Sequence, residues 1–395
     1  MQWYDWWVFC QVEDGQWKEL LYSLVGDEPD LEKDWYSLFT RLWRGISTAL
    51  QINDDPTIDS LIAQLVEEKV INTDNKGDSL SNARTMIFAI VGWQTMLYRP
   101  DLGTCPPLEL AIMDELDGYQ GMARITLKQM QSMCERPLYE LLMGFGLLLP
   151  RFNFHSFGAE ENQDVFEKWK TIDSQTCNAF LLTSIGRVTI KWVDSLCCHL
   201  EFDHASNTLY LFRYPSFCVT NIIRRESDKC HKSVLHACAV ADYGGRQWAT
   251  ADEVTHMLHE TVISYRLLFG QNKQARKLFR KLDPFHGVPE PQRDELLTEL
   301  CGRKRCPKIN EREVYDLAHD FPVLRCRLVV LQRCLDVQKP RTWKELWQDK
   351  RNSAQWFTFW AVLILGGVGI FLTFLQVILQ VVQIALQQNT PSPAT

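Results

Sequence analysis

The pattern of apolar and polar residues divides the chain into a long mixed part and a short, almost entirely apolar C-terminal part. In residues 1–150, apolar side chains recur three and four positions apart, as they do over Trp35–Ile46. This spacing predicts amphipathic helices with one buried face. Residues 151–338 continue with helix-compatible patterns and one alternating stretch. We therefore predict a mostly α-helical protein, with an N-terminal helical region at 1–150 and a mixed, mainly helical region at 151–338.

Alternation between apolar and polar positions is clearest at residues 200–214. Leu200–Asp203 and Thr208–Tyr214 flank a four-residue, mainly polar turn, which predicts a small β-hairpin. Other apolar stretches are interpreted as helical. They are residues 108–116, 125–133, 179–193, 251–268, 296–300, 314–318 and 323–335.

The most apolar stretch lies at the end of the sequence, where Asn352–Thr395 contains no Asp, Glu, Lys or Arg. A helix of roughly 20 apolar residues crosses a hydrocarbon layer of about 30 Å. We predict a basic juxtamembrane segment at 339–355, a transmembrane helix with a glutamine-striped extension at 356–386, and an uncharged tail at 387–395. The alternative is a buried core helix of a soluble protein.

Flanking charge predicts the orientation of this helix. Residues 339–351 contain five basic and two acidic residues, whereas residues 387–395 contain none. The positive-inside rule then places the N-terminal part in the cytosol. Lys350 and Arg351 are expected among the lipid headgroups, and Trp356 and Trp360 in an aromatic belt. The protein is thus predicted to be a single-pass, tail-anchored membrane protein with lipids as one partner.

Three glutamines follow the most apolar part of this helix. Gln376, Gln380 and Gln383 are spaced by four and three residues, so they share one helical face. They form either a hydrated stripe on a helix that leaves the bilayer, or a polar seam that pairs with another membrane helix. The second interpretation predicts a protein partner or self-association through this helix.

Composition narrows the partners and compartments that the sequence allows. The net charge of −7 argues against a nucleic-acid partner. The first residues lack the basic and apolar regions of a signal peptide. Thirteen cysteines with no regular spacing then predict free thiols, many of them buried, in a reducing compartment.

Residues that could bind a metal gather between positions 197 and 238. They are Cys197, Cys198, His199, Cys230, His231, His236 and Cys238. Their spacing matches no standard zinc finger, ribbon or knuckle, so we interpret them as buried thiols and surface imidazoles and expect no cofactor. A zinc site is the alternative.

The motif Glu-x-x-His occurs twice, at Glu201/His204 and Glu253/His256. A di-iron site in a helical bundle would need both copies on facing helices, and only the second lies on a predicted helix. A di-iron site is therefore not expected.

Three patches resemble a family of uncharacterised filamentous-fungal proteins. They are Phe212–Cys218, Ser264–Gly270, and the membrane approach formed by Asp349–Arg351 with Trp356–Val362. The resemblance implies a fungal source and a C-terminal membrane helix. It implies no reaction, cofactor or catalytic residue.

The sequence contains no Walker loop, dinucleotide fingerprint, Gly-x-Ser-x-Gly elbow or protein-kinase motif set. Together with the predicted anchor, this favours a non-enzymatic, membrane-tethered helical module with a protein-interaction or scaffolding role. The alternative is a membrane-associated enzyme, or an accessory protein, of fungal secondary metabolism. Its unassigned Cys, His and Asp residues would then carry the chemistry.

Overall fold

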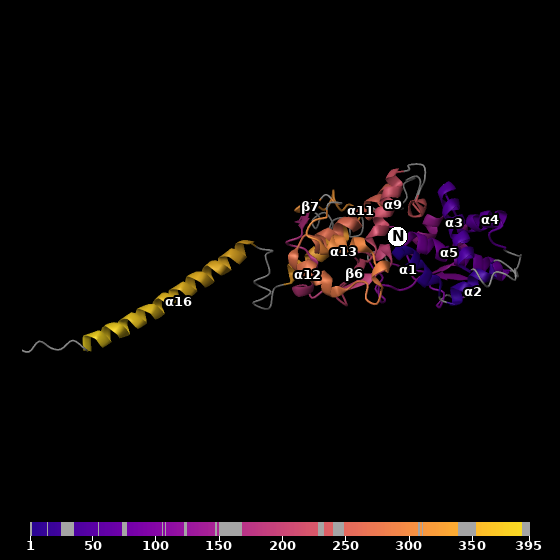
Figure 1. The fold of residues 1–395 in the computed structure, drawn as a ribbon. Coiled ribbons are helices and arrows are strands. Elements are labelled where there is room, and N and C mark those ends of the chain that lie inside the picture. The colour runs from indigo at the N-terminus through magenta and orange to yellow at the C-terminus, as the bar shows by residue number, and fades with distance from the viewer. Residues whose placement is uncertain are drawn as a thin grey trace, which may run out of the picture. The chain divides into compact units, whose positions relative to one another are not determined.

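The computed structural model divides the chain into two compact units, residues 1–338 and residues 339–395. The fold is mostly helical with a few small sheets, and one long apolar helix lies in the second unit (Figure 1). The predicted fold class is confirmed in these features. The structure describes residues 2–13, 15–24, 35–53, 55–72, 77–104, 106, 108–121, 125–146, 148–149, 168–227, 233–239, 249–306, 309, 311–338 and 353–388.

The described elements alternate between helices and very short strands. The helices are α1 (Gln2–Val12), α2 (Gly15–Ser23), α3 (Trp35–Ile52), α4 (Ile58–Glu67), α5 (Gly77–Thr95), η2 (Gln131–Glu135), α6 (Leu138–Gly144), α8 (Ala179–Ser184), η3 (Leu196–Cys198), α9 (Pro215–Ser227), α10 (Val234–Ala237), α11 (Ala251–Tyr265), η4 (Arg266–Gly270), α12 (Lys273–Leu282), η5 (Glu290–Gln292), α13 (Glu295–Gly302), α14 (Arg325–Val337) and α16 (Ser353–Gln388). The strands are β1 (Glu109–Ala111), β2 (Lys128–Met130), β3 (Thr171–Asp173), β4 (Thr189–Val193), β5 (Phe202–Asp203), β6 (Thr208–Phe212) and β7 (Val314–Asp316).

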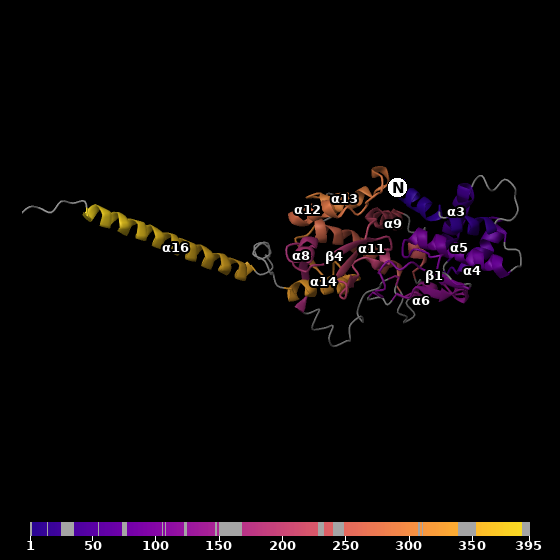
Figure 2. The ribbon, with the colours of Figure 1, turned by 90° about the horizontal axis from the view of Figure 1, so that it is seen from below.

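The N-terminal helices form because each one carries an apolar stripe. On α3, Leu38, Leu42 and Ile46 recur every four residues and are buried. A capping box, in which Thr57 and Ser60 exchange hydrogen bonds, starts α4. Helix α5 is buried continuously from Met86 onward, so the other helices pack around it. Figures 1 and 2 place α3, α4 and α5 together at one end of the first unit and α12 at the other.

Three small sheets complete the first unit. Strands β1 and β2 pair antiparallel, as do β3 and β7. The predicted hairpin is present as β5 and β6, with Phe202 opposite Leu209. Strand β4 pairs with the other edge of β6 in parallel, with Thr189 opposite Thr208. The sequence pattern did not predict this third strand.

Four of the predicted helices are wrong in whole or in part. Residues 108–116 and 125–133 contain β1 and β2, and 314–318 contains β7, because short apolar runs fit a strand as well as a helix. The stretch 179–193 is helical only to Ser184 and then becomes β4. The break is at Gly186, where a Cβ would lie 2.7 Å from the Leu182 carbonyl oxygen, and at Arg187, whose φ is +57°.

The regions 1–150 and 151–338 share one core. Helix α10 packs against α3 and α5. Trp3 Nε1 donates a hydrogen bond to Ser216 Oγ at 2.8 Å, and Trp7 Nε1 donates to Asp194 Oδ2 at 3.1 Å. The N-terminal tryptophans therefore belong to the core, and they connect the two regions.

A buried ion pair connects α14 to the hairpin sheet. Arg327 Nη2 lies 2.6 Å from Glu201 Oε1, and the two side chains are 4% and 0% exposed. The same guanidinium donates hydrogen bonds to the carbonyl oxygens of Cys197, at 2.8 Å, and His199. Removing one partner of such a pair leaves an uncompensated buried charge.

We expect Arg327→Leu to lower the free energy of unfolding by about 3–5 kcal/mol, because Glu201 and two carbonyl groups lose their partner. The control Arg333→Leu changes an exposed arginine on the same helix and should cost less than about 0.5 kcal/mol. The measurement is urea unfolding of the detergent-solubilised chain, followed by tryptophan fluorescence. Equal costs for the two substitutions would show that the pair does not hold α14 in place.

Candidate functional site

The C-terminal helix α16 is the most conspicuous functional feature. It spans 36 residues, and the segment Phe357–Ala385 is long and apolar enough to cross a membrane and is not buried by the protein. The hydroxyl of Thr373 donates to the Gly369 carbonyl oxygen at 2.9 Å, so the helix satisfies this polar group itself. Length and composition alone support membrane crossing.

The structure places most of the predicted membrane residues on this helix. Trp356 and Trp360 lie in its first turns, and Gln376, Gln380 and Gln383 lie on one exposed face. Lys350 and Arg351 lie outside the described residues.

His199 is buried, at 1% exposed, so its interpretation as a surface imidazole is wrong. The Phe212 backbone N–H donates to Nδ1 at 3.2 Å, so Nε2 carries the ring proton and donates to Ser264 Oγ at 2.8 Å. Burial, with a smaller contribution from Arg327, lowers the pKa of His199 to about 3. The ring is therefore neutral, and neither nitrogen has a lone pair left for a metal.

His236 is also buried, at 2% exposed, and is not the predicted surface imidazole. Its Nε2 lies 2.9 Å from Thr255 Oγ1, whose own proton goes to the Ala251 carbonyl, so Nε2 donates. Its Nδ1 then accepts from Ser233 Oγ at 2.6 Å. Burial lowers the pKa of His236 to about 4. The Cys238 thiol donates to the Val234 carbonyl at 3.3 Å. Cys230 and His231 lie outside the described residues.

Among the residues that the structure describes, no group of three or more His, Cys, Asp and Glu side chains is arranged to hold a metal ion. The two Glu-x-x-His motifs have structural explanations. Glu201 pairs with Arg327, and Glu253 completes a capping box with Thr250 at the start of α11. The capping box could have been found in the sequence as Thr-x-x-Glu ahead of an apolar helix.

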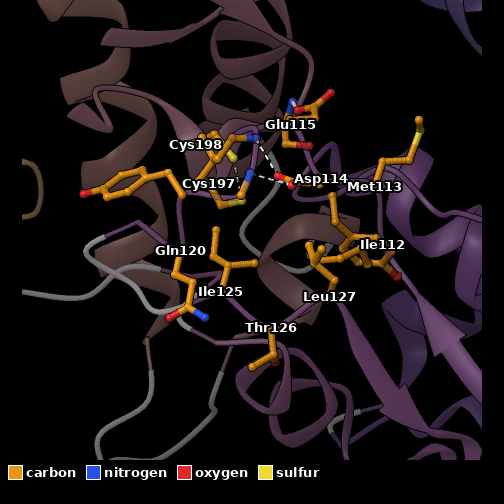
Figure 3. Close-up of a pocket in the computed structure, with 15 residues that line it drawn as sticks. Ile112, Met113, Asp114, Glu115, Gln120, Ile125, Thr126, Leu127, Cys197 and Cys198 are labelled. Atoms are coloured by element: carbon orange, nitrogen blue, oxygen red, sulfur yellow. Dashed lines mark hydrogen bonds between the residues drawn. The ribbon is translucent and has the colours of Figure 1, made fainter. Parts of the chain in front are cut away.

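Cys197 and Cys198 line a cavity of about 270 Å³. Figure 3 shows the two cysteines at one side and Thr126 and Leu127 at the other. The sulfur atoms lie 3.7 Å apart, and the hydrogen bond to Cys197, together with burial, raises the pKa of Cys198 well above its usual range. Cys198 is therefore protonated at neutral pH and a poor nucleophile.

Glu115, on the wall of the same cavity, belongs to a network of partly buried charges that the sequence did not indicate. Its carboxylate accepts the Ser195 N–H at 2.7 Å and lies 3.6 Å from Arg99 Nη1. Asp194 lies 3.8 Å from the same Arg99 nitrogen and 2.5 Å from Arg213 Nε. Burial, then the charge of Asp194, raises the pKa of Glu115. No spacing in the sequence indicates that these four residues meet.

A larger groove of about 1000 Å³ lies where α9, α11 and α13 meet. Its size is at the upper end of the range for ligand pockets, about 300–1,000 Å³. Apolar residues form most of its walls, and acidic residues lie among them. The described lining residues are Trp3, Ser216, Val219, Thr220, Ile222, Ile223, Glu226, His259, Val262, Ile263, Pro291, Arg293, Asp294, Glu295, Leu296, Glu299 and Ile309.

A scan against protein-family models, a search of curated proteins and a search of solved structures each found no match. The function must therefore be inferred from the residues and their geometry.

One buried carboxyl group makes a specific pH dependence testable. Glu260 on α11 accepts the N–H groups of Val323 and Leu324, at 2.9 and 2.6 Å, where α14 begins. Burial outweighs these bonds and raises the pKa of Glu260 to about 8. The folded state therefore keeps a proton that the unfolded state releases above about pH 4.5.

Between pH 5 and 8 the Glu260 contribution to stability should fall as pH rises, by up to about 1.4 kcal/mol per pH unit. Glu260→Gln cannot ionise, so the stability of the wild type minus that of this variant should decrease over this range. Urea unfolding at each pH measures this difference in stability, and the exposed Glu67→Gln is the control. Parallel pH profiles for the wild type and Glu260→Gln would contradict the raised pKa.

Proposed function

We propose that this chain is a single-pass, tail-anchored membrane protein whose residues 1–338 lie in the cytosol and bind partner proteins. The observation that carries the proposal is the unburied apolar surface of Phe357–Ala385. Water solvates such a surface poorly, and a bilayer covers it without further structure. The resemblance to the fungal family extends the proposal to a fungal source.

Flanking charge supports the cytosolic orientation. The segment that leads into α16 carries five basic and two acidic residues between positions 339 and 351, and the tail after residue 387 carries none. Basic residues stay on the cytosolic side during insertion.

A binding role fits the described interior better than catalysis. His199 and His236 are neutral and doubly hydrogen-bonded, and Cys198 is protonated. One observation supports the alternative of a membrane-associated enzyme, namely the raised pKa of Glu115 beside a cavity. The carboxylate of Glu115 is, however, already held by the Ser195 N–H and by Arg99.

A glycosylation acceptor fused after Thr395 should be modified in microsomes, because the tail would reach the lumen, whereas an acceptor placed before Met1 should not. Replacing the acceptor asparagine with glutamine provides the control. Deleting residues 353–395 should release the chain from carbonate-washed membranes. Modification at the N-terminus alone would invert the topology, and carbonate-resistant binding of the truncated chain would refute the anchor.

The glutamine face of α16 tests association through the membrane helix. Replacing Gln376, Gln380 and Gln383 with Leu should reduce crosslinked dimers or captured partner about tenfold or more, since each interhelical amide bond contributes about 0.6–2 kcal/mol. The matched control changes Ile378, Val381 and Ala385 to Leu on the opposite face. Crosslinking that is equal in the two triple variants would leave only the hydrated-stripe interpretation.

A further inference from the structure

The groove between α9, α11 and α13 has walls built from helical ridges. Helix α9 presents Val219, Ile222, Ile223 and Glu226 to the groove, at spacings of three and four residues. Helix α11 presents His259, Val262 and Ile263, and α13 presents Leu296 and Glu299, at the same kind of spacing. Each helix therefore turns one complete face towards the same space.

The floor of the groove is apolar and partly open. Ile222 and Val262 are each 6% exposed, whereas Ile223 is 54% exposed. An isoleucine half in water at the edge of a concave apolar surface is typical of an interaction site, whereas single exposed apolar residues on a convex surface are ordinary. The groove can therefore bury further apolar side chains.

The charge around this floor is predominantly negative. Glu226, Asp294, Glu295 and Glu299 line the groove, and Arg293 is the one lysine or arginine among the described lining residues.

The basic side chains near the groove either already have partners or are neutral. Arg293 Nε donates to the Val288 carbonyl at 2.6 Å, and Arg293 Nη1 lies 3.8 Å from Asp283. Burial lowers the pKa of His259, so its ring adds no positive charge at neutral pH. Arg303, which is not among the described lining residues, pairs with Glu299 at 3.3 Å.

We propose that this groove is the docking site for a cationic amphipathic helix of a partner protein, with its apolar face over Ile223 and its Lys or Arg residues against Glu226, Glu295 and Glu299. This inference rests on the proposed interaction role and specifies its partner. Ridges spaced by three and four residues interdigitate with the ridges of another helix.

The placement of the carboxylates decides between a helix and a small amphipathic amine. Glu226 lies in the last turn of α9, whereas Glu295 and Glu299 lie in successive turns of α13. A single amine carries one positive charge and cannot neutralise three carboxylates. A helix with several cationic residues can meet all of them while its apolar face fills the floor.

The test uses the full chain in phosphatidylcholine nanodiscs, with empty nanodiscs subtracted. The probe is a fluorescein-labelled 18-residue Leu/Lys amphipathic helix, followed by fluorescence anisotropy. Comparison probes are the Leu/Glu helix of identical pattern and a Leu/Lys peptide scrambled so that it has no apolar face. Dodecylamine serves as a small competitor with one charge.

Two exposed positions provide groove variants that should still fold, Ile223→Ser and Glu226→Lys. Each has a matched control on another helix, Ile52→Ser at the end of α3 and Glu67→Lys in the last turn of α4. We expect each groove variant to weaken binding of the Leu/Lys helix about tenfold or more, and each control less than about twofold. Raising the salt concentration should weaken the wild type more than Glu226→Lys.

Equal binding of the Leu/Glu or scrambled peptide would overturn the proposal, as would groove variants that behave like their controls. Displacement of the probe by an equimolar concentration of dodecylamine would reassign the groove to a small amine and also overturn it. If the membrane anchor were wrong, the glycosylation acceptor fused after Thr395 would stay unmodified. That result is separate from peptide binding, so failure of the anchor and failure of the groove proposal are distinguishable.

Discussion

The start of α14 is the point on which the surrounding structure depends, because a buried carboxyl group holds it from one side and a buried arginine from the other. Glu260 of α11 accepts the N–H groups of Val323 and Leu324 just before the helix begins. One turn later, Arg327 reaches Glu201 and the carbonyl oxygens of Cys197, within η3, and of His199, which follows it. Helices α11 and α14 and the hairpin sheet are thereby fixed relative to one another through hydrogen bonds with defined geometry.

A buried arginine forms a similar connection at the end of α13. Arg266 is 0% exposed, and its guanidinium donates to the carbonyl oxygens of Leu300, Arg303 and Lys304 and pairs with Glu311 at 2.7 Å. These carbonyls belong to the helix end and the chain that leaves it, where a positive charge is favourable. Well-packed apolar residues could stabilise these positions equally well, but they would not specify which elements meet.

The sequence predicts the helices with strong periodicity and the apolar C-terminal helix, since those signals are local. The amphipathic stretch that begins at Ala251 becomes α11, and the glutamines of α16 fall on one face. The very short strands and the buried charges could not be predicted, because their partners are distant in the chain. Arg327 finds Glu201 more than a hundred residues away, and nothing near either residue indicates the pair. The groove is likewise a product of packing, since no pattern within α9, α11 or α13 indicates that the three helices meet.

In the proposed architecture, the membrane anchor increases the occupancy of the groove. Tethering would hold the first unit close to a membrane, which raises the effective concentration at which it meets a partner in the same membrane. At such concentrations a groove that binds weakly in solution is well occupied, and a large interface is unnecessary. A cationic helix is also the kind of segment that anionic headgroups hold at the membrane surface. The acidic groove residues would then compete with lipid for the same helix, so occupancy of the groove would depend on the composition of the membrane as well as on the partner.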